Sequence, residues 1–321
     1  MKLVRALVLA AAASLPLSVA ANDYPSDTVR LVVPFPPGGS LDTMGRPLAD
    51  HLRKRWNKPV IVDNRPGAST IIGTDAVAKA APDGLTLLFT ADVSITSNPF
   101  LFNKLPFDPI QDLVPIVQLI NSPMILAINP SLEVDTLQEL VDLAKREPHR
   151  INYASFGTGT PAHLLFEALR AKTGAELTHI PYKGYGPALH ATLSGEVPIT
   201  LVSAMSGPYF DAGKLKPIAI DRDQRSPLYP DLPTFTEAGY GDIGLRAWFG
   251  MFAPKGTPQA IIDQVRDDVV QVLQDPQFLA SQVDGMGFTA VGNTPTEFAE
   301  FIQADYEYKG DLIRSTGVKI E

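Results

Sequence analysis

Residues 32–42 read VVPFPPGGSLD and stand at a junction in the chain. An apolar run, Val29–Val33, comes before them, and apolar residues then recur every four positions from Met44 to Trp56. This pattern predicts a buried strand, a glycine-bearing turn and a helix. Gly38 and Gly39 allow positive φ angles and close approach of a ligand to the backbone.

The first turn of that helix, near residues 40–43, has N–H groups without an intrahelical partner. Together with the helix dipole, these groups favour an anion. An ordinary turn, in which Ser40 or Asp42 caps the helix, is the alternative.

A second segment, residues 152–165, has the same form. It reads NYASFGTGTPAHLL and predicts a strand, a glycine-rich loop over Gly157–Thr160, and a helix beginning at Pro161. One such loop is weak evidence, but two in one chain suggest two helix starts that line a shared site for an anionic ligand.

Strand-like and helix-like segments alternate elsewhere too, which argues for α/β layers with parallel strands. Expected strands lie at 60–62, 85–89, 124–128 and 151–154, and expected helices at 136–146 and 162–171. Thr136 with Glu139, and Thr294 with Glu297, have the spacing of a capping box.

Two proline-rich segments, 104–123 and 226–241, interrupt this alternation and are expected to be crossovers between lobes. The predicted organisation is lobe 1 at 22–123 plus 240–321, and lobe 2 at 124–239.

A third loop at 63–70 offers small residues and hydroxyl groups. Arg65 in it can pair with a ligand carboxylate or with Asp63, and the local pair is favoured because most such pairs are local.

The first residues resemble a secretory signal peptide, predicted at 1–21. Lys2 and Arg5 precede an apolar run at 6–17, and small residues at 18–20 suit cleavage before Ala21 or Asn22. An N-terminal helix or anchor is the alternative. The chain contains no Cys, which excludes a lipid-anchored lipoprotein and disulfides.

The chain is 45% apolar and 19% charged, as a globular protein is. Loss of the two signal-peptide cations would change its net charge from −8 to −10. An acidic surface argues against nucleic acid as a partner, and it means that an anionic ligand needs local donors.

Catalytic and metal-binding motifs are missing. The chain has no G-x-S-x-G, H-E-x-x-H, P-loop or Rossmann fingerprint, so no metal and no cofactor are predicted. The alternative to a binding protein is an exported hydrolase or isomerase, in which His163 works with a carboxylate as general acid and base.

Several segments in order resemble the Bug family, the substrate-binding components of tripartite tricarboxylate transporters. They include VRLVVPFPPGGSLD from Val29, YASFGTGTPAHL from Tyr153, YKGYGPAL from Tyr182 and the segment from Trp248 to Pro258. The likeness covers nearly the whole chain after the signal peptide.

The resemblance implies a two-lobed α/β periplasmic-binding-protein fold of type II, with two crossovers and a ligand between the lobes. It implies a monomeric periplasmic receptor, not an enzyme, for a small carboxylate, with membrane permease subunits as partners. An exported receptor that signals to a sensor protein is an alternative.

In the family, backbone amides and bridging waters of two loops hold a carboxylate. The expected ligand-binding residues are Phe35, Pro36, Gly38, Gly39, Ser40, Asp42, Ser69, Asp92, Ala154, Ser155, Gly157, Thr158, Gly159, Thr160, His163 and Trp248. Trp248 can also fill the core. Many relatives have glycines at the positions of Ser69 and Thr70, so the resemblance does not identify the ligand.

Overall fold

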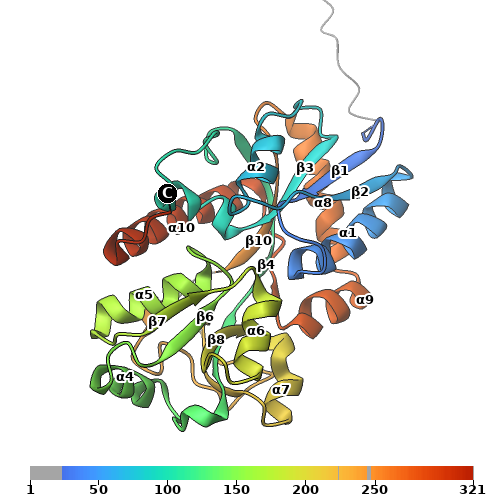
Figure 1. Cartoon of the computed structure of the whole chain (residues 1–321). Helices are drawn as coiled ribbons and strands as arrows, with labels where there is room; N and C mark the ends of the chain where they lie inside the picture. The colour runs from blue at the N-terminus through green and yellow to red at the C-terminus, as the bar shows by residue number, and fades with distance from the viewer. Residues whose placement is uncertain (1–23, 223, 244–246, 321) are drawn as a thin grey trace, which may run out of the picture.

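The computed structural model describes residues 24–222, 224–243 and 247–320, and the expected signal peptide at 1–21 lies outside them. The described residues form two lobes, which lie one above the other in Figure 1. Lobe 1 contains a six-stranded sheet and lobe 2 a five-stranded sheet. None of the described helices is long and apolar enough to cross a membrane.

The sheet of lobe 1 has the strand order β11-β4-β10-β3-β1-β2. Its strands are β1 (Val29–Val33), β2 (Val60–Asn64), β3 (Thr86–Ala91), β4 (Leu113–Asn121), β10 (Trp248–Pro254) and β11 (Thr289–Ala290). β1 is parallel to β2 and β3, as predicted, but β10 is antiparallel to β3 and β4. The predicted parallel strands are therefore present, and the antiparallel strand β10 is added between β3 and β4 where the chain returns from lobe 2.

Helices cover both faces of this sheet (Figure 1). They are α1 (Ser40–Trp56), α2 (Ile71–Ala78), α3 (Asn98–Leu101), α8 (Gln259–Leu273), α9 (Pro276–Phe278) and α10 (Pro295–Thr316). On β1, Leu31 belongs to the core cluster with α1 and α8, whereas Val32 belongs to the cluster with Trp248 and Phe298. Burial on both faces explains why β1 is apolar at almost every position.

The sheet of lobe 2 has the order β7-β6-β8-β5-β9. Its strands are β5 (Met124–Ile128), β6 (Asn152–Ser155), β7 (Thr178–Pro181), β8 (Ile199–Ser203) and β9 (Lys216–Ile220). The helices are α4 (Leu137–Arg146), α5 (Pro161–Thr173), α6 (Tyr185–Leu193) and α7 (Gly207–Asp211). β6 is parallel to β7 and β8, whereas β5 is antiparallel to β8 and β9.

The chain passes between the sheets at two adjacent places. β4 leads into β5 through residues 122–123, at the end of the first predicted crossover segment. The return lies between Ile243 and Trp248, later than the predicted segment 226–241, because Phe235 and Tyr240 of that segment pack in a core cluster with lobe 2 strands. The N–H of Ser122 donates to the carbonyl of Ala247 (2.8 Å), which joins the two passages.

Two predicted helix starts are confirmed in different degrees. α10 begins with a complete capping box formed by Thr294 and Glu297. At α4, the Thr136 hydroxyl accepts from the Glu139 N–H (3.1 Å), but the Glu139 carboxylate accepts from the N–H of Asp135 instead of Thr136. That box is therefore only half formed.

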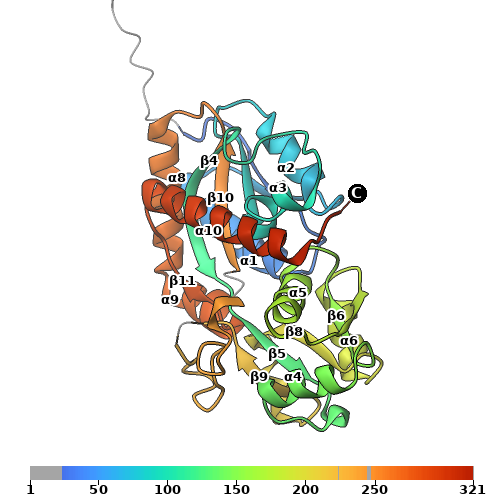
Figure 2. The same ribbon diagram turned by 90° about the vertical axis from the view of Figure 1, so that its left-hand side faces the viewer.

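The long helix α10 connects the lobes. Figure 2 shows it lying along lobe 1 and reaching α5 at its C-terminal end, and the two helices are in contact. Phe298 near its start packs in lobe 1, whereas Ile313 near its end packs with residues of α5.

Candidate ligand-binding site

The parallel strands of the two lobes end at edges that face each other. In lobe 1, the start of β10 pairs with the end of β3, Phe249 with Ala91. In lobe 2, the start of β5 pairs with the end of β8, Met124 with Ser203. Since only residues 122–123 separate β4 from β5, the two edges are neighbours. The carboxyl ends of strands in open α/β sheets are where ligands bind.

Three loops lie at these facing edges. They are loop 1 (34–39) after β1, loop 2 (156–160) after β6 and loop 3 (65–70) after β2. Loops 1 and 2 therefore lie at the same region between the lobes, and each leads directly into a helix.

Asp42 fixes the backbone of loop 1 through a hydrogen bond. Gly38 has a φ of 80°, where an L side chain is strained, whereas Gly39 has an ordinary φ of −78° as the N-cap of α1. The N–H of Gly38 donates to Asp42 Oδ2 (2.9 Å), and Arg46 Nε donates to the same oxygen (3.0 Å). Burial by itself raises the pKa of Asp42, but the hydrogen bonds from Arg46 and Gly38 outweigh it and hold this pKa below its usual value.

The helix starts behind loops 1 and 2 have no side-chain caps. Among the described residues, no protein group accepts from the N–H groups of Ser40, Leu41 and Asp42 at α1. The same is true of Ala162 and His163 at α5. Both helix starts therefore carry unpaired donors beside glycine-bearing turns, as an anion requires.

Loop 2 folds back on its own side chains. The Ser155 hydroxyl contacts the N–H and carbonyl of Gly157, and the Thr160 hydroxyl donates to the same carbonyl (2.7 Å). A Cβ on Gly159 would lie 2.5 Å from Leu101 of lobe 1. The loop therefore packs closely against the other lobe, and the φ of 77° at Gly159 also favours glycine there.

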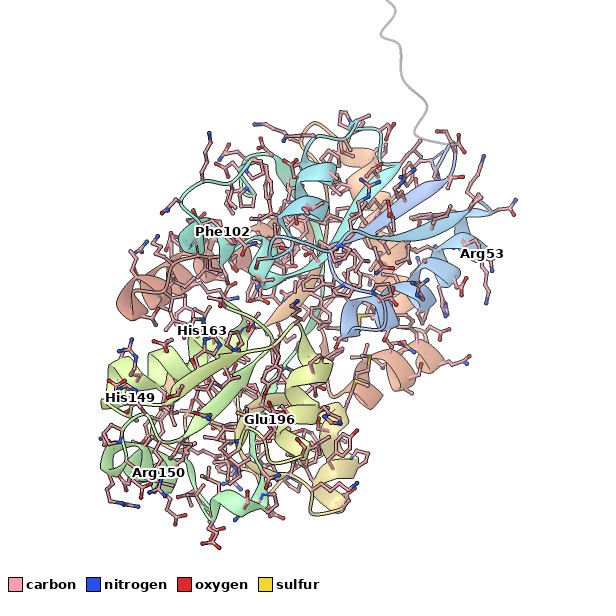
Figure 3. All side chains as sticks on the ribbon, in the orientation of Figure 1. Arg53, Phe102, His149, Arg150, His163 and Glu196 are labelled. Atoms are coloured by element: carbon pink, nitrogen blue, oxygen red, sulfur yellow. The ribbon has the colours of Figure 1, made fainter. Side chains whose placement is uncertain are left out.

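A stack of rings lies under loop 2. His163 stacks on His179 with ring centroids 4.0 Å apart, and His179 stacks on Tyr153. Figure 3 shows His163 at the side of lobe 2 that faces lobe 1, below Phe102. The N–H of Gly159 donates to His163 Nδ1 (3.0 Å), so this nitrogen is unprotonated. Burial lowers the pKa of both histidines to about 4.

Loop 3 has an unusual backbone. Ala68, Ser69 and Thr70 all have positive φ angles, of 45°, 50° and 76°, although none is a glycine. Arg65 Nε donates to Asp63 Oδ2 (2.9 Å), as the local-pair prediction had it. Arg65 is therefore already partnered by Asp63 at the end of β2.

Residues 44–318 match the family described as the tripartite tricarboxylate transporter family receptor. The chain belongs to this receptor family. It is 35% identical over 316 residues to Protein BugT of Bordetella pertussis, an alignment that covers 98% of this chain and 97% of that protein.

Solved structures of similar receptors have the same fold. One is R. palustris Rpa4515 with adipate, at 29% identity and a TM-score of 0.85 over 92% of this chain and 99% of that one. Another is MatC from Rhodopseudomonas palustris with bound malate, at 29% identity and a TM-score of 0.81 over 90% and 100%. The predicted two-lobed type II binding-protein fold is confirmed, and the family is a solute-binding receptor type rather than an enzyme type.

In this receptor, most of the expected ligand-binding residues lie at the facing edges. Phe35, Pro36, Gly38, Gly39 and Ser40 surround the start of α1, Ser69 lies in loop 3, and Gly157, Thr158, Gly159 and Thr160 form loop 2. Four others lie behind the loops. These are Asp42, Ala154, Ser155 and His163, and all four are buried.

Two expected ligand contacts are corrected by the structure. Trp248 is fully buried, and its Nε1 donates to Asp305 (2.9 Å). Asp92 is only 3% exposed and forms an ion pair with Lys309. A buried charge needs a partner, and Asp92 finds it in the core of lobe 1 instead of in a ligand.

The buried group of Asp92, Lys309 and Asp305 is the main feature that sequence reasoning missed. Lys309 and Asp305 lie on α10 four residues apart, and both are buried. The sequence contains an indication of this group. The apolar stripe of the helix, Phe298 and Ile302, continues at helical spacing to these two charged residues. Charges on a buried stripe indicate a mutual pair.

The arrangement does not favour the hydrolase alternative. Ser155 Oγ lies 2.6 Å from His179 Nε2, the spacing of a nucleophile and its base. However, Ser155 is fully buried, and His163 faces another histidine instead of a carboxylate. No group of three or more metal-ligating side chains occurs within the described part of the chain.

Proposed function

We propose that this protein is an extracytoplasmic solute-binding receptor that captures a small carboxylate between its lobes and delivers it to the permease subunits of a tripartite tricarboxylate-type transporter. The observation that carries the proposal is the pair of uncapped helix starts, at α1 and α5, on the facing edges of the lobes. Their free N–H groups offer a carboxylate several donors at once.

The contacts that we propose come from loops 1 and 2 and from Ser69 of loop 3. Relatives with adipate and with malate support a small carboxylate as the ligand class. The negative net charge of this chain, −8 with the signal peptide included, gives no long-range attraction for such a ligand, so the affinity comes from short-range donors.

In this proposal, the hinge includes the passage at 122–123, where the N–H of Ser122 donates to the carbonyl of Ala247. Ligand held by loop 1 on one lobe and loop 2 on the other favours the closed arrangement, and the closed receptor docks on the permease. The receptor is a monomer in the periplasm, exported by the peptide at 1–21.

Isothermal titration calorimetry against a panel of small carboxylates tests the proposal. The panel contains aliphatic mono- and dicarboxylates, hydroxy acids, amino acids and aromatic acids, with the matching amides as controls. We expect at least one acid to bind with micromolar affinity or better and its amide not to bind. A folded protein that binds none of the acids contradicts the proposal.

The membrane protein that binds the receptor distinguishes delivery of the ligand to a transporter from signalling to a sensor. Detergent-solubilised membranes are passed over the ligand-loaded receptor and the retained proteins are identified. Recovery of permease subunits supports transport, whereas recovery of a sensor kinase instead supports the signalling alternative.

A further inference from the structure

A chain of buried hydrogen bonds runs from the core of lobe 1 to the surface of loop 3. Thr90 and Ser94 share a hydroxyl contact of 2.5 Å, and Ser94 Oγ donates to Thr70 Oγ1 (2.8 Å). Asn98 Nδ2 donates to Thr70 Oγ1 (3.2 Å) and to the carbonyl of Ser69 (2.7 Å). Ser69 is the only member that is not buried.

The orientation of the Asn98 amide follows from these partners. A carbonyl oxygen only accepts, so the Asn98 atom beside the Ser69 carbonyl must be the nitrogen. The other side-chain atom, Oδ1, therefore lies toward Ser69 Oγ, at 3.4 Å. Since Oδ1 also only accepts, the Ser69 hydroxyl is the donor in this contact.

These contacts leave the Ser69 hydroxyl oxygen able to accept a hydrogen bond. Its proton is directed toward Asn98 Oδ1 over a long contact of 3.4 Å, and no described residue donates to its lone pairs. The side chain is partly exposed at the edge of lobe 1 that faces lobe 2. Ser69 thus presents a hydrogen-bond acceptor to the region between the lobes.

The backbone conformation of loop 3 does not favour a serine at position 69. Ser69 has a φ of 50°, where an L residue costs about 1–2 kcal/mol relative to glycine. The Thr70 side chain is held in the buried hydrogen-bond chain, but the Ser69 side chain contributes only one long contact. Strain of this kind gathers at binding sites.

We propose that Ser69 Oγ accepts a hydrogen bond from the ligand, and that the ligand is therefore a carboxylate that also carries a donor, a hydroxyl or an ammonium group. Ser69 is then a specificity-determining residue for hydroxy acids or amino acids over plain carboxylic acids. The inference rests on the proposed receptor function and narrows its ligand class.

Three four-carbon probes of matched skeleton test this inference: L-malate carries a hydroxyl, L-aspartate an ammonium, and succinate neither. Lactate, alanine and propionate form a smaller set, and 3-phenyllactate, phenylalanine and 3-phenylpropionate an aromatic one. Dissociation constants are measured for the unmodified chain, Ser69→Ala, Ser69→Gly and Ala68→Gly. The last variant relieves a neighbouring positive φ of 45° without removing a hydroxyl, so it is the matched control.

We expect the hydroxy acid or the amino acid of the set that fits to bind about five- to tenfold tighter than the plain acid. In both Ser69 variants this ratio falls to about 1, whereas Ala68→Gly keeps it. Which of the two acids prevails distinguishes a hydroxyl from an ammonium.

Two results overturn the inference while leaving the receptor function intact. One is equal affinity for the plain acid in the unmodified chain, and the other is a ratio that survives in Ser69→Ala and Ser69→Gly. If no acid in any set binds, the receptor function itself fails, and the inference fails with it.

Discussion

Replacing Gly39 by valine should greatly weaken ligand binding at the start of α1 while it changes the stability of the fold only slightly. Gly39 is the N-cap, with φ −78° and ψ 172°, which a β-branched residue adopts without strain. A Cβ there meets only the Pro36 carbonyl, at 3.6 Å, an ordinary contact. Valine is a poorer N-cap than glycine, so we expect the free energy of unfolding to fall by no more than about 1 kcal/mol.

The effect on the ligand is much larger, because an N-cap side chain lies over the N–H groups of the second and third helical residues, here Leu41 and Asp42. A hydrogen bond to a charged acceptor contributes about 1.5–3 kcal/mol. Loss of two such bonds, about 3–6 kcal/mol, predicts a dissociation constant raised about 150- to 25,000-fold.

The assay is calorimetry with the best acid of the panel, with urea unfolding in parallel. Thr136→Val at the N-cap of α4 is the control. Its hydroxyl caps the Glu139 N–H, so this variant should lose about 1 kcal/mol of stability and no affinity. If Gly39→Val binds within threefold of the unmodified chain, the amides of α1 do not hold the ligand and the reasoning is refuted.

Two further predictions concern buried ionisable groups. Burial lowers the pKa of His163 to about 4, from an unfolded value of 6.5. Between pH 4 and pH 6.5, His163 is therefore protonated in the unfolded chain but neutral in the folded chain. The contribution of His163 to stability should fall by about 2–3 kcal/mol as the pH drops from 7 to 4.5, and His179 adds a similar term. His163→Gln should therefore make the slope in urea titrations shallower by the His163 part, and an unchanged slope contradicts the prediction. Lys309→Met leaves two buried carboxylates, Asp92 and Asp305, without their cation, so it should cost about 3–5 kcal/mol in guanidinium unfolding, and a loss below 1 kcal/mol would show that the pair is not needed.

Much of the fold follows from local patterns. β1 and β5 have the bounds that their apolar runs predicted, and α10 starts at its predicted capping box. The return crossover was misplaced because proline and glycine content marks irregular backbone without saying which core that backbone covers. Phe235 and Tyr240 lie in such irregular backbone and still pack with lobe 2 strands.

The candidate site was predictable only as a set of loops. The glycine-bearing turns at α1 and α5 could be found because a helix start needs few residues to specify it. The partners of Asp92 could not, since Lys309 is 217 positions away in sequence. Sequence alone likewise does not reveal the positive φ of Ser69 and Thr70, because neither residue type is typical of that backbone.

Two ionisable residues, one in the helix behind loop 1 and one in the helix behind loop 2, share one physical task. Asp42 holds Gly38 of loop 1, and His163 holds Gly159 of loop 2. Each uses its hydrogen-bonding capacity on the backbone, and each is buried. Such residues fix where the amides point, but they do not distinguish one acid from another. In the proposed receptor, discrimination among acids then comes from neutral side chains that keep free hydrogen-bonding capacity at the facing edges, and we propose Ser69 as such a side chain.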